Sequence, residues 1–427
     1  MGAIILISSL FILAIIGVPL AYTLGASGLL YFLIEKPEFL NIFAQRVWSG
    51  TNSAVMIAMP LFILAGNIMN RGGITKRIID FCLLIVRPIH GGLGEVNVLD
   101  SMIFGGISGS SVADTAALGS IMIPAMEEKG YDRKFAAGIT VATSTMGMII
   151  PPSIPMLVYA MASGESVGAL FLAGLVPGVL IGICQFVVCN IISRKRNYLP
   201  EPTKTSFKET WEILKDSSFA IVMPIIIVGS ITFGVVTATE SAAVAVLYAL
   251  IVGFFVYKEL KIKDLIPILK ETLIASSSVM FIIGFAMIFT WVLAIEQIPA
   301  QIGAFFMSLQ IDKIWILLAF DLLILIVGTM IDVSPAILLL TPIMLPVMEN
   351  VGMSGLQFGA ALITGLAIGL ITPPVGMCLN ACSKINKMPI TDIFIGATPF
   401  LICNVFIFVL ITLIPELTTW IPSLFMK

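Results

Sequence analysis

The sequence predicts an all-α polytopic membrane protein built from two inverted-topology repeats. Of its 427 residues, 59% are hydrophobic and only 11% are charged, whereas a soluble domain carries about 25% charged residues. Nearly charge-free stretches of about 20 residues recur from end to end, and each is long enough to cross a bilayer as a helix. The two halves of the chain also match each other at a fixed offset of 222 residues. This composition excludes a soluble enzyme and a disordered chain, and the lack of polar–apolar alternation argues against a membrane β-barrel.

The apolar stretches fall into two groups along the chain. The first stretch begins without Lys or Arg, so it lacks the basic start of a cleavable signal peptide and is expected to remain as a membrane helix. The hydrophilic stretch 193–218 separates the groups. We therefore place the first repeat at 1–218, with 193–218 as a cytoplasmic linker, and the second repeat at 219–427. The predicted apolar segments are 3–18, 20–34, 52–70, 78–86, 96–126, 135–162, 167–192, 219–236, 241–257, 265–295, 299–309, 314–345, 356–382 and 390–414.

Matched glycines and prolines are the strongest sign of the repeat. Apolar residues match by chance in such a chain, but helix-breaking residues do so rarely, and here no gap is needed. A Pro-Pro pair recurs among them, which indicates that both halves interrupt a helix at the same place. The matched positions are Gly106 and Gly328, Pro124 and Pro346, Gly130 and Gly352, Gly147 and Gly369, Pro151-Pro152 and Pro373-Pro374, Gly174 and Gly396, and Pro177 and Pro399.

The basic residues predict how the repeats lie in the membrane, because Lys and Arg favour the cytoplasmic side. One path satisfies every basic cluster, and it starts with the N-terminus outside. It has a re-entrant hairpin at about 92–128 on the cytoplasmic side and another at about 299–350 on the outer side, with an odd number of crossings between them, so the second repeat is upside down. A broken helix follows each hairpin, at about 133–163 and about 356–385. The basic clusters are 71–77, 129–134, 194–208, 258–263 and 384–387.

The chemistry is expected where the hairpin tips meet the broken helices, as in secondary transporters with inverted repeats. The tips at 105–115 and 328–335 are rich in Gly and polar residues, and the breaks at 147–153 and 369–374 contain a Gly and two prolines. Proline frees backbone carbonyls, which persist at membrane depth only inside protein or around a polar cavity. Such oxygens suit Na⁺. Each repeat is therefore predicted to bind a cation, with an anionic substrate between the repeats at the positive ends of half-helices.

The tips themselves could serve only as close helix-packing surfaces, but their recurrence in both repeats favours ion sites.

Two acids in these tips also allow more than one interpretation. Asp332 is either a functional intramembrane acid or a cap for the helix that follows it, and we favour function. Asp114 could equally be a site residue, but we favour a cap for a helix that starts at Thr115.

The remaining polar residues carry weaker signals. Ser108, Ser111 and Ser153 are candidate ligands, because each lies in a tip or a break. Glu240 lies at a short outer loop and is interpreted as a helix-start residue. Asp321 lies inside an apolar run, and its repeat neighbourhood offers no partner, so the sequence assigns it no role.

Several function classes are excluded by what the sequence lacks. It has no P-loop, so the chain is not expected to use ATP itself. Its single histidine, His90, excludes a histidine metal centre and a Ser-His-Asp arrangement. A net charge of −2 argues against nucleic acid as a partner. The six cysteines lie in or beside apolar segments with no zinc or haem spacing, so we expect them to pack as small apolar residues.

Five motifs in different parts of the sequence form a specific combination. The motifs are Pro60-Leu-Phe-Ile-Leu-Ala-Gly66, Ser108-Gly-Ser-Ser-Val-Ala-Asp-Thr-Ala-Ala-Leu-Gly119, Pro151-Pro-Ser153, Thr237-Ala-Thr-Glu-Ser-Ala-Ala243 and Thr372-Pro-Pro-Val-Gly376. Over nearly the whole chain, this combination resembles the large membrane subunit of tripartite ATP-independent periplasmic (TRAP) transporters.

The resemblance implies an elevator-type transporter in a bacterial inner membrane, with a periplasmic N-terminus. In such systems a transport domain of hairpins and broken helices slides against a fixed scaffold, driven by a Na⁺ gradient. The implied partners are a periplasmic substrate-binding protein and a small four-helix membrane subunit. Because this chain begins at the first large-subunit helix, the small subunit is expected to be a separate chain. The implied substrate is an organic acid anion, with sialic acid favoured and a C4-dicarboxylate next.

The resemblance also implies site residues, by motif position. One Na⁺ site would be formed by Ser108, Ser111, Gly147, Ile150 and Pro151. The second would be formed by Gly328, Asp332, Gly369, Thr372 and Met377. Substrate would be bound by Ser108, Ser153 and Asp332. The two sites are not expected to be equivalent, because the second tip has Asp332 and Pro335 where the first has Ser110 and Ala113.

Three rival functions differ from this one by class. An autonomous Na⁺-coupled anion transporter or antiporter of related fold would need no binding protein. A channel could not concentrate its solute. A purely structural membrane protein would not depend on Asp332 for transport.

Overall fold

A computed structural model of the chain describes residues 2–103, 105, 109–200, 207–308 and 311–426. This part of the chain is helical, with no β-strand. Eight helices are long and apolar enough to cross a membrane, and the bent pair Pro37–Thr51 and Val55–Arg71 adds a ninth if it is one span. The eight are Arg133–Ser163, Val167–Lys195, Thr210–Thr232, Ala238–Val256, Ile262–Ile295, Lys313–Met330, Val333–Asn350 and Ile390–Leu413. The prediction of an all-α polytopic membrane protein is confirmed.

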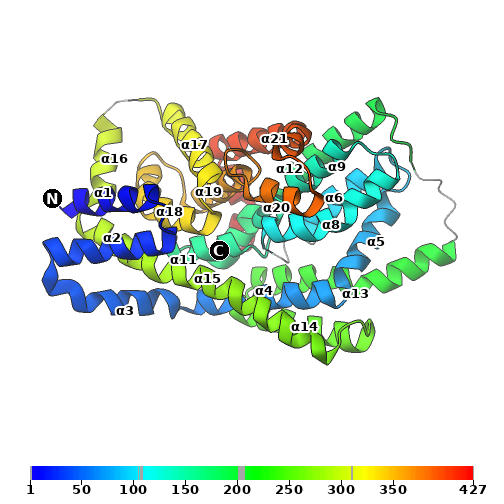
Figure 1. Cartoon of the computed structure of the whole chain (residues 1–427), viewed down its shortest axis with the longest axis horizontal. Helices are drawn as coiled ribbons and strands as arrows, with labels where there is room; N and C mark the ends of the chain where they lie inside the picture. Colours follow the sequence, from blue (N-terminus) through cyan, green and yellow to red (C-terminus); the bar gives the residue numbers. More distant parts are fainter. Residues whose placement is uncertain (1, 104, 106–108, 201–206, 309–310, 427) are drawn as a thin grey trace.

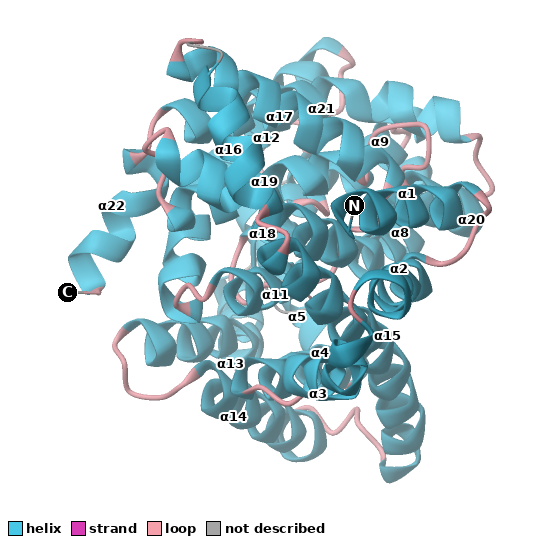
Figure 2. Cartoon of the chain, turned by 90° about the vertical axis from the view of Figure 1, so that its left-hand side faces the viewer, coloured by secondary structure: helices cyan, strands magenta, loops and turns pink. Residues whose placement is uncertain are grey.

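One set of helices, here called the peripheral group, lies along one side of the molecule. In Figure 1 most of it runs along the lower edge, and Figure 2 shows α3, α4, α13 and α14 at the bottom of the turned view. The long helix α15 packs against α2, α3 and α4, and α14 packs against α4. The group consists of α1 (Gly2–Ile15), α2 (Leu20–Glu35), η1 (Pro37–Phe39), α3 (Leu40–Thr51), α4 (Ala54–Arg71), α13 (Phe207–Thr232), α14 (Ala238–Ile251), η2 (Val252–Val256) and α15 (Ile262–Ile295).

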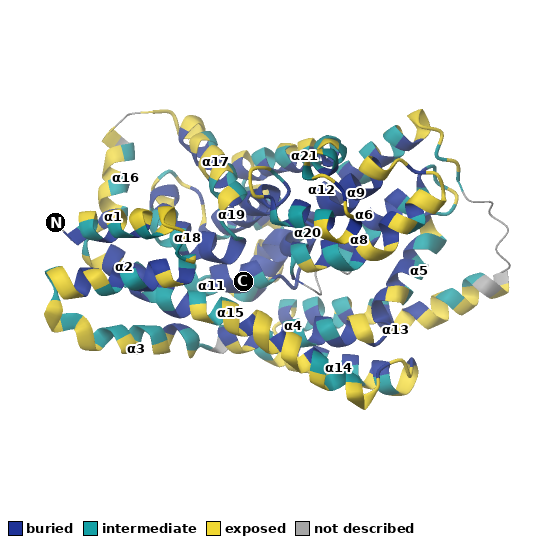
Figure 3. Ribbon diagram, viewed as in Figure 1, coloured by how far each residue is buried: buried dark blue, intermediate teal, exposed yellow. Residues whose placement is uncertain are grey.

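The other helices, here called the hairpin group, form the more buried side of the molecule. In the apolar part of Arg133–Ser163, 94% of residues are buried, against 22% for Thr210–Thr232 in the peripheral group, and Figure 3 shows the contrast. The group consists of α6 (Gly92–Ile103), α8 (Ser111–Glu128), α9 (Arg133–Thr143), α10 (Met146–Ile149), α11 (Ile154–Ser163), α12 (Val167–Lys195), α17 (Lys313–Met330), α18 (Val333–Asn350), α19 (Gly355–Gly369), α20 (Met377–Asn386), α21 (Ile390–Leu413) and α22 (Glu416–Phe425). The shorter helices α5 (Ile74–Val86) and α16 (Ile298–Ser308) precede the two hairpins.

The helix boundaries follow the sequence repeat. The offset of 222 residues maps Ser111, where α8 begins, onto Val333, where α18 begins. It also maps Arg133, the first residue of α9, onto Gly355, the first residue of α19. Both Pro-Pro bonds of the breaks are cis. The matched residues therefore start and interrupt equivalent helices in the two halves.

Two predicted segments have different internal boundaries in the structure. Within the predicted linker 193–218, α13 already begins at Phe207, because the polar residues that follow include no Gly or Pro to stop a helix. Within the predicted hairpin 299–350, α16 is a separate helix that packs on α18, and the hairpin itself is formed by α17 and α18.

Candidate functional site

A cavity of about 520 Å³ lies between the two helix groups, at the tips of both hairpins. One wall comes from the peripheral group and the other from the hairpin group, so neither group makes the cavity alone. Its polar lining residues are Asn67 and Asn70 on α4, Glu271 on α15, Ser110 and Asp114 in the first hairpin, and Asp332 and Ser334 in the second.

The second helix of each hairpin begins at this cavity. Ser110 is the N-cap of α8, and its Oγ accepts a hydrogen bond from the Ala113 N–H at 3.4 Å. The repeat-equivalent residue Asp332 is the N-cap of α18, and its Oδ1 accepts from the Val333 N–H at 2.8 Å. Helix N-termini favour anions. Asp332 therefore caps α18, one of the two alternatives that the sequence allowed, and its side chain also lines the cavity.

The break in the first repeat leaves two carbonyls without their usual helical donors. Pro151 and Pro152 have no N–H for the carbonyls of Gly147 and Met148. The Ser153 hydroxyl donates to the Met148 carbonyl, and Ser153 also caps α11 by accepting from the Met156 N–H at 3.3 Å. Ser153 is only 1% exposed. It therefore lies behind the cavity wall, next to the wall residues Met148, whose carbonyl it bonds, and Ile154, which follows it in sequence.

The first hairpin packs its backbone directly on this break. A Cβ added at Gly147 would overlap Asp114 Oδ2 and lie 3.0 Å from the Gly105 carbonyl oxygen. Ser111 lies one turn before Asp114 on α8 and is fully buried, and in the part of the chain described its hydroxyl has no hydrogen-bond partner. The structure thus brings a buried hydroxyl, a carboxylate and the Gly147 backbone together, which are suitable donors for a hard cation.

The structure locates some of the other residues predicted for the first ion site and does not describe others. Ile150 and Pro151 are buried, and they are the two residues that follow α10, the short helix that contains Gly147. Ser108 lies outside the described residues. Asp114 was favoured as a helix cap, and this expectation is wrong, because α8 begins earlier, at Ser111, and uses Ser110 as its cap. The carboxylate of Asp114 is turned instead toward Gly147.

The second repeat makes the same close backbone contact with different polar partners. A Cβ added at Gly369 would lie 2.5 Å from Gly328 Cα, so hairpin and break touch backbone to backbone. Thr372 Oγ1 donates to the Ile368 carbonyl at 2.8 Å. The Val375 N–H donates to the Thr329 carbonyl at 3.3 Å, which links the break to the tip. Of the residues predicted for the second ion site, Asp332 and Met377 reach the cavity, whereas Gly328 and Gly369 are buried in the contact behind it.

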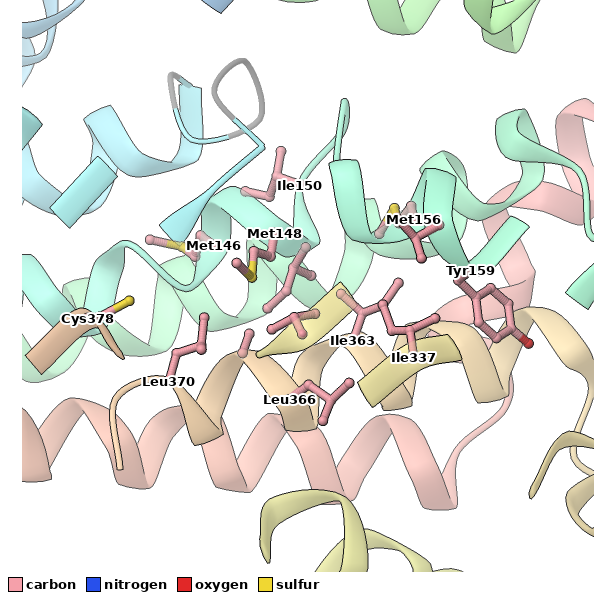
Figure 4. Close-up of a cluster of buried hydrophobic side chains, with 14 of the residues drawn as sticks. Met146, Met148, Ile150, Met156, Tyr159, Ile337, Ile363, Leu366, Leu370 and Cys378 are labelled. Atoms are coloured by element: carbon pink, nitrogen blue, oxygen red, sulfur yellow. The ribbon is translucent and has the colours of Figure 1, made fainter. Parts of the chain in front are cut away.

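The two breaks also share an apolar core. Figure 4 shows Met146, Met148 and Ile150 of the first break in one cluster with Leu370 and Cys378 of the second. The Tyr159 hydroxyl at the end of this cluster donates to the Gly355 carbonyl at 2.7 Å, which joins α11 to the start of α19. The two breaks are therefore packed against each other through buried apolar side chains.

Sequence reasoning missed the peripheral wall of the cavity. Asn67 and Asn70 are three residues apart on α4 and face the cavity together, and Asn67 Nδ2 also donates to Thr272 Oγ1 at 3.0 Å. Glu271 lines the cavity and forms an ion pair of 2.6 Å with Arg71. Two amides at helical spacing within the apolar segment 52–70 are the signal that could have found part of this wall.

Comparison with known proteins agrees with the fold. A solved structure, the YdaH transporter of Alcanivorax borkumensis, superposes with a TM-score of 0.64 at 13% identity, over 96% of this chain and 98% of that chain. At this identity the likeness shows a shared fold alone.

Sequence comparison identifies the family. The family model described as "Tripartite ATP-independent periplasmic transporter, DctM component" matches residues 7–417. The sialic acid TRAP transporter large permease protein SiaM of Vibrio cholerae is 36% identical over 410 residues, covering 96% of each chain. The C4-dicarboxylate TRAP transporter large permease protein DctM of Pseudomonas aeruginosa is 37% identical over 401 residues, covering 94% of each chain. These relatives are transport permease subunits and not enzymes. The chain belongs to the DctM family of large permease components of tripartite ATP-independent periplasmic transporters.

Proposed function

We propose that this permease is a Na⁺-coupled uptake system for an organic acid anion. The observation that carries the proposal is the charge of the cavity. Two helix N-termini, at Ser110 and Asp332, favour an anion. Yet the ionisable side chains among the described lining residues are all carboxylates, those of Asp114, Glu271 and Asp332. An anion enters such a cavity favourably only with cations that offset the carboxylates.

Na⁺ is the cation that best suits the groups around the cavity. The groups near the two breaks are carboxylate, hydroxyl and backbone carbonyl oxygens, which are hard ligands. We assign one Na⁺ to the region of Ser111, Asp114 and Gly147. We assign a second to the region of Gly328, Asp332 and Gly369. In this scheme Na⁺ is a transported ion, and its binding prepares the cavity for the anion.

A sugar acid with one carboxylate is the favoured substrate, as in the sialic acid relative. Asn67, Asn70, Ser110 and Ser334 line the cavity with groups that can hydrogen-bond to several hydroxyls. A C4-dicarboxylate would bring a second carboxylate toward the wall that contains Glu271. Like charges in a confined cavity repel, so the dicarboxylate is the second candidate.

We further propose the partners and the membrane placement that the family name suggests. A periplasmic binding protein delivers the substrate, and a small membrane subunit, as a separate chain, accompanies this one. The complex lies in the bacterial inner membrane with the N-terminus of this chain in the periplasm. The hairpin group moves against the peripheral group, because the cavity lies between the two.

The test is uptake of labelled sialic acid into proteoliposomes that contain this chain and its small subunit. Four conditions are compared, with and without an inward Na⁺ gradient and with and without the binding protein. Uptake that needs both supports the proposal. Uptake that needs Na⁺ alone supports the autonomous transporter. Downhill flux with no accumulation under a Na⁺ gradient supports a channel. If only labelled C4-dicarboxylate accumulates, the coupling stands and the substrate assignment is replaced.

A further inference from the structure

Asp321 is an acid in the middle of a membrane-spanning helix, and the proposed transport scheme does not use it. It is the ninth of the 18 residues of α17, so it lies about 13 Å from either end at a rise of 1.5 Å per residue. Its side chain is only 3% exposed. An ionised carboxylate at this depth is costly unless it is paired and fully hydrogen-bonded.

The hydrogen bonds around Asp321 do not satisfy an ionised carboxylate. Thr412 Oγ1 lies 2.9 Å from Asp321 Oδ1 and 3.1 Å from the Phe408 carbonyl oxygen. A hydroxyl has one hydrogen, so Thr412 cannot donate a full hydrogen bond to both acceptors. The other carboxylate oxygen, Oδ2, is buried and has no hydrogen-bond partner in the described ranges.

A protonated Asp321 resolves this conflict. Its carboxyl O–H then donates to Thr412 Oγ1, and the Thr412 O–H donates to the Phe408 carbonyl. Both observed distances then correspond to complete hydrogen bonds. Oδ2 then belongs to a neutral acid, whose burial without a partner costs far less than that of a charge.

The helices around Asp321 offer no charge that would stabilise its ionised form. It packs among α18, α19 and α21. Helix α19 has no titratable side chain, and the acid of α18 is Glu349, one residue from the helix end. On α21, Asp392 is in the first turn and pairs with Lys134, and Cys403 lies nine residues before Thr412, about 13 Å along the helix. The cation of α17 itself, Lys313, is its first residue.

We propose that Asp321 is a proton-binding site in the second hairpin, and that it holds a proton in this conformation. The step is the combination of the carboxylate with one proton from water to form the neutral acid, with Thr412 as the acceptor of its O–H. Proton loss would place an unpaired charge in the packed hairpin and would disfavour this conformation. Uptake is therefore controlled by pH through Asp321, in addition to any Na⁺ coupling.

The direct test is infrared spectroscopy of the purified membrane protein, which needs no substrate and so does not depend on the proposed function. Wild type is expected to show the C=O band of a protonated carboxylic acid at neutral pH, sensitive to D₂O and lost at high pH. Asp321→Asn should remove one component of this band, measured as a loss in the difference spectrum between wild type and variant, because the buried acids Glu95 and Asp100 also contribute to the band. The matched control Asp312→Asn changes an exposed acid at the start of the same helix, where Asn also caps well, and should keep it. A difference spectrum between wild type and Asp321→Asn that shows no lost C=O component overturns the proposal.

Two further measurements connect the proton to its partner and to transport. Thr412→Val removes the acceptor of the O–H, so this component should shift rather than vanish, and an unshifted component overturns the proposal even if Asp321→Asn does not fold. In proteoliposomes with a constant Na⁺ gradient, wild-type uptake should fall by up to about tenfold per pH unit above the titration midpoint. Asp321→Asn should flatten this fall, and Asp312→Asn should not. A wild-type pH profile in Asp321→Asn overturns control of uptake by this site.

Discussion

Ser110 and Asp332 occupy the same position in the two repeats, 222 residues apart, and each is the N-cap of a helix that begins at the central cavity. One cap is a neutral hydroxyl and the other a carboxylate. The two halves therefore present the same backbone geometry with different charge. In the proposed scheme, an anion between the two caps meets one neutral end and one end whose carboxylate is offset by a cation.

The substitution Asp332→Asn tests the negative charge of Asp332 separately from its role as the N-cap of α18. Asn caps a helix about as well as Asp, so the thermal unfolding midpoint should not change. The apparent Na⁺ affinity of uptake should fall by about tenfold or more, because a cation ligand loses its charge. Both quantities are measured on the same purified preparation. Ser110→Ala is the matched variant, and it should lose about 1 kcal/mol of stability while its Na⁺ dependence stays close to wild type. An unchanged Na⁺ affinity in Asp332→Asn would refute the role of its charge.

Gly147→Ala and Gly369→Ala should both disrupt the contact between hairpin and break. The added Cβ would meet Asp114 and the Gly105 backbone in one case and the Gly328 backbone in the other. Forced overpacking of this kind costs about 1–3 kcal/mol. Thermal unfolding in detergent and Na⁺-driven uptake should both decrease. Gly229→Ala, on a peripheral helix with nothing within 4 Å of the added atom, is the control and should behave as wild type.

Glu271→Gln should change substrate preference. It removes a carboxylate from the peripheral wall and leaves the size of the side chain almost unchanged. Competition by a C4-dicarboxylate against labelled sialic acid should strengthen several-fold, because a repulsion is removed. Stability should change by less than about 1 kcal/mol, since the ion pair with Arg71 is solvent-accessible. Glu212→Gln, on an exposed part of α13, is the control. Equal competition in both variants would argue against contact between Glu271 and substrate.

Arg77→Ala should weaken the joint between α5 and the peripheral group. The guanidinium pairs with Glu259 at 2.6 Å and with Asp216 at 3.1 Å, and it lies 3.8 Å from the ring centroid of Tyr257. Its side chain is only 14% exposed, so the loss should cost about 1.5–3 kcal/mol. Arg77→Lys should recover little of this, because a lysine cannot bond both acids and stack on the ring. A thermal shift assay measures both variants, and full recovery by lysine would contradict the geometry.

The repeat itself could be predicted because it rests on local chemistry. Apolar runs form helices in a membrane whatever lies beside them. Two consecutive prolines remove two backbone donors and so break a helix, although single prolines such as Pro124 and Pro177 lie inside helices here. The breaks at Pro151 and Pro373 were therefore visible as patterns, whereas α8 begins at Ser111 and not at Thr115, where the sequence had placed its start. The boundary of α13 at Phe207 was missed because the whole polar stretch 193–218 was interpreted as a linker, although its part from residue 207 to 218 contains no Pro or Gly.

The sequence by itself determined the membrane class, the two repeats, the breaks and the family motifs, since each depends on neighbours along the chain. Only the tertiary structure decided which side chains share a space. It placed the Asp114 carboxylate beside Gly147, although the sequence had favoured a helix cap, and it placed Asn67 in the same cavity lining as the hairpin tips. It also paired Asp321 with Thr412, 91 residues away. No local pattern encodes such pairs, because they arise from how whole helices pack, and packing sums many weak contacts that no single segment specifies.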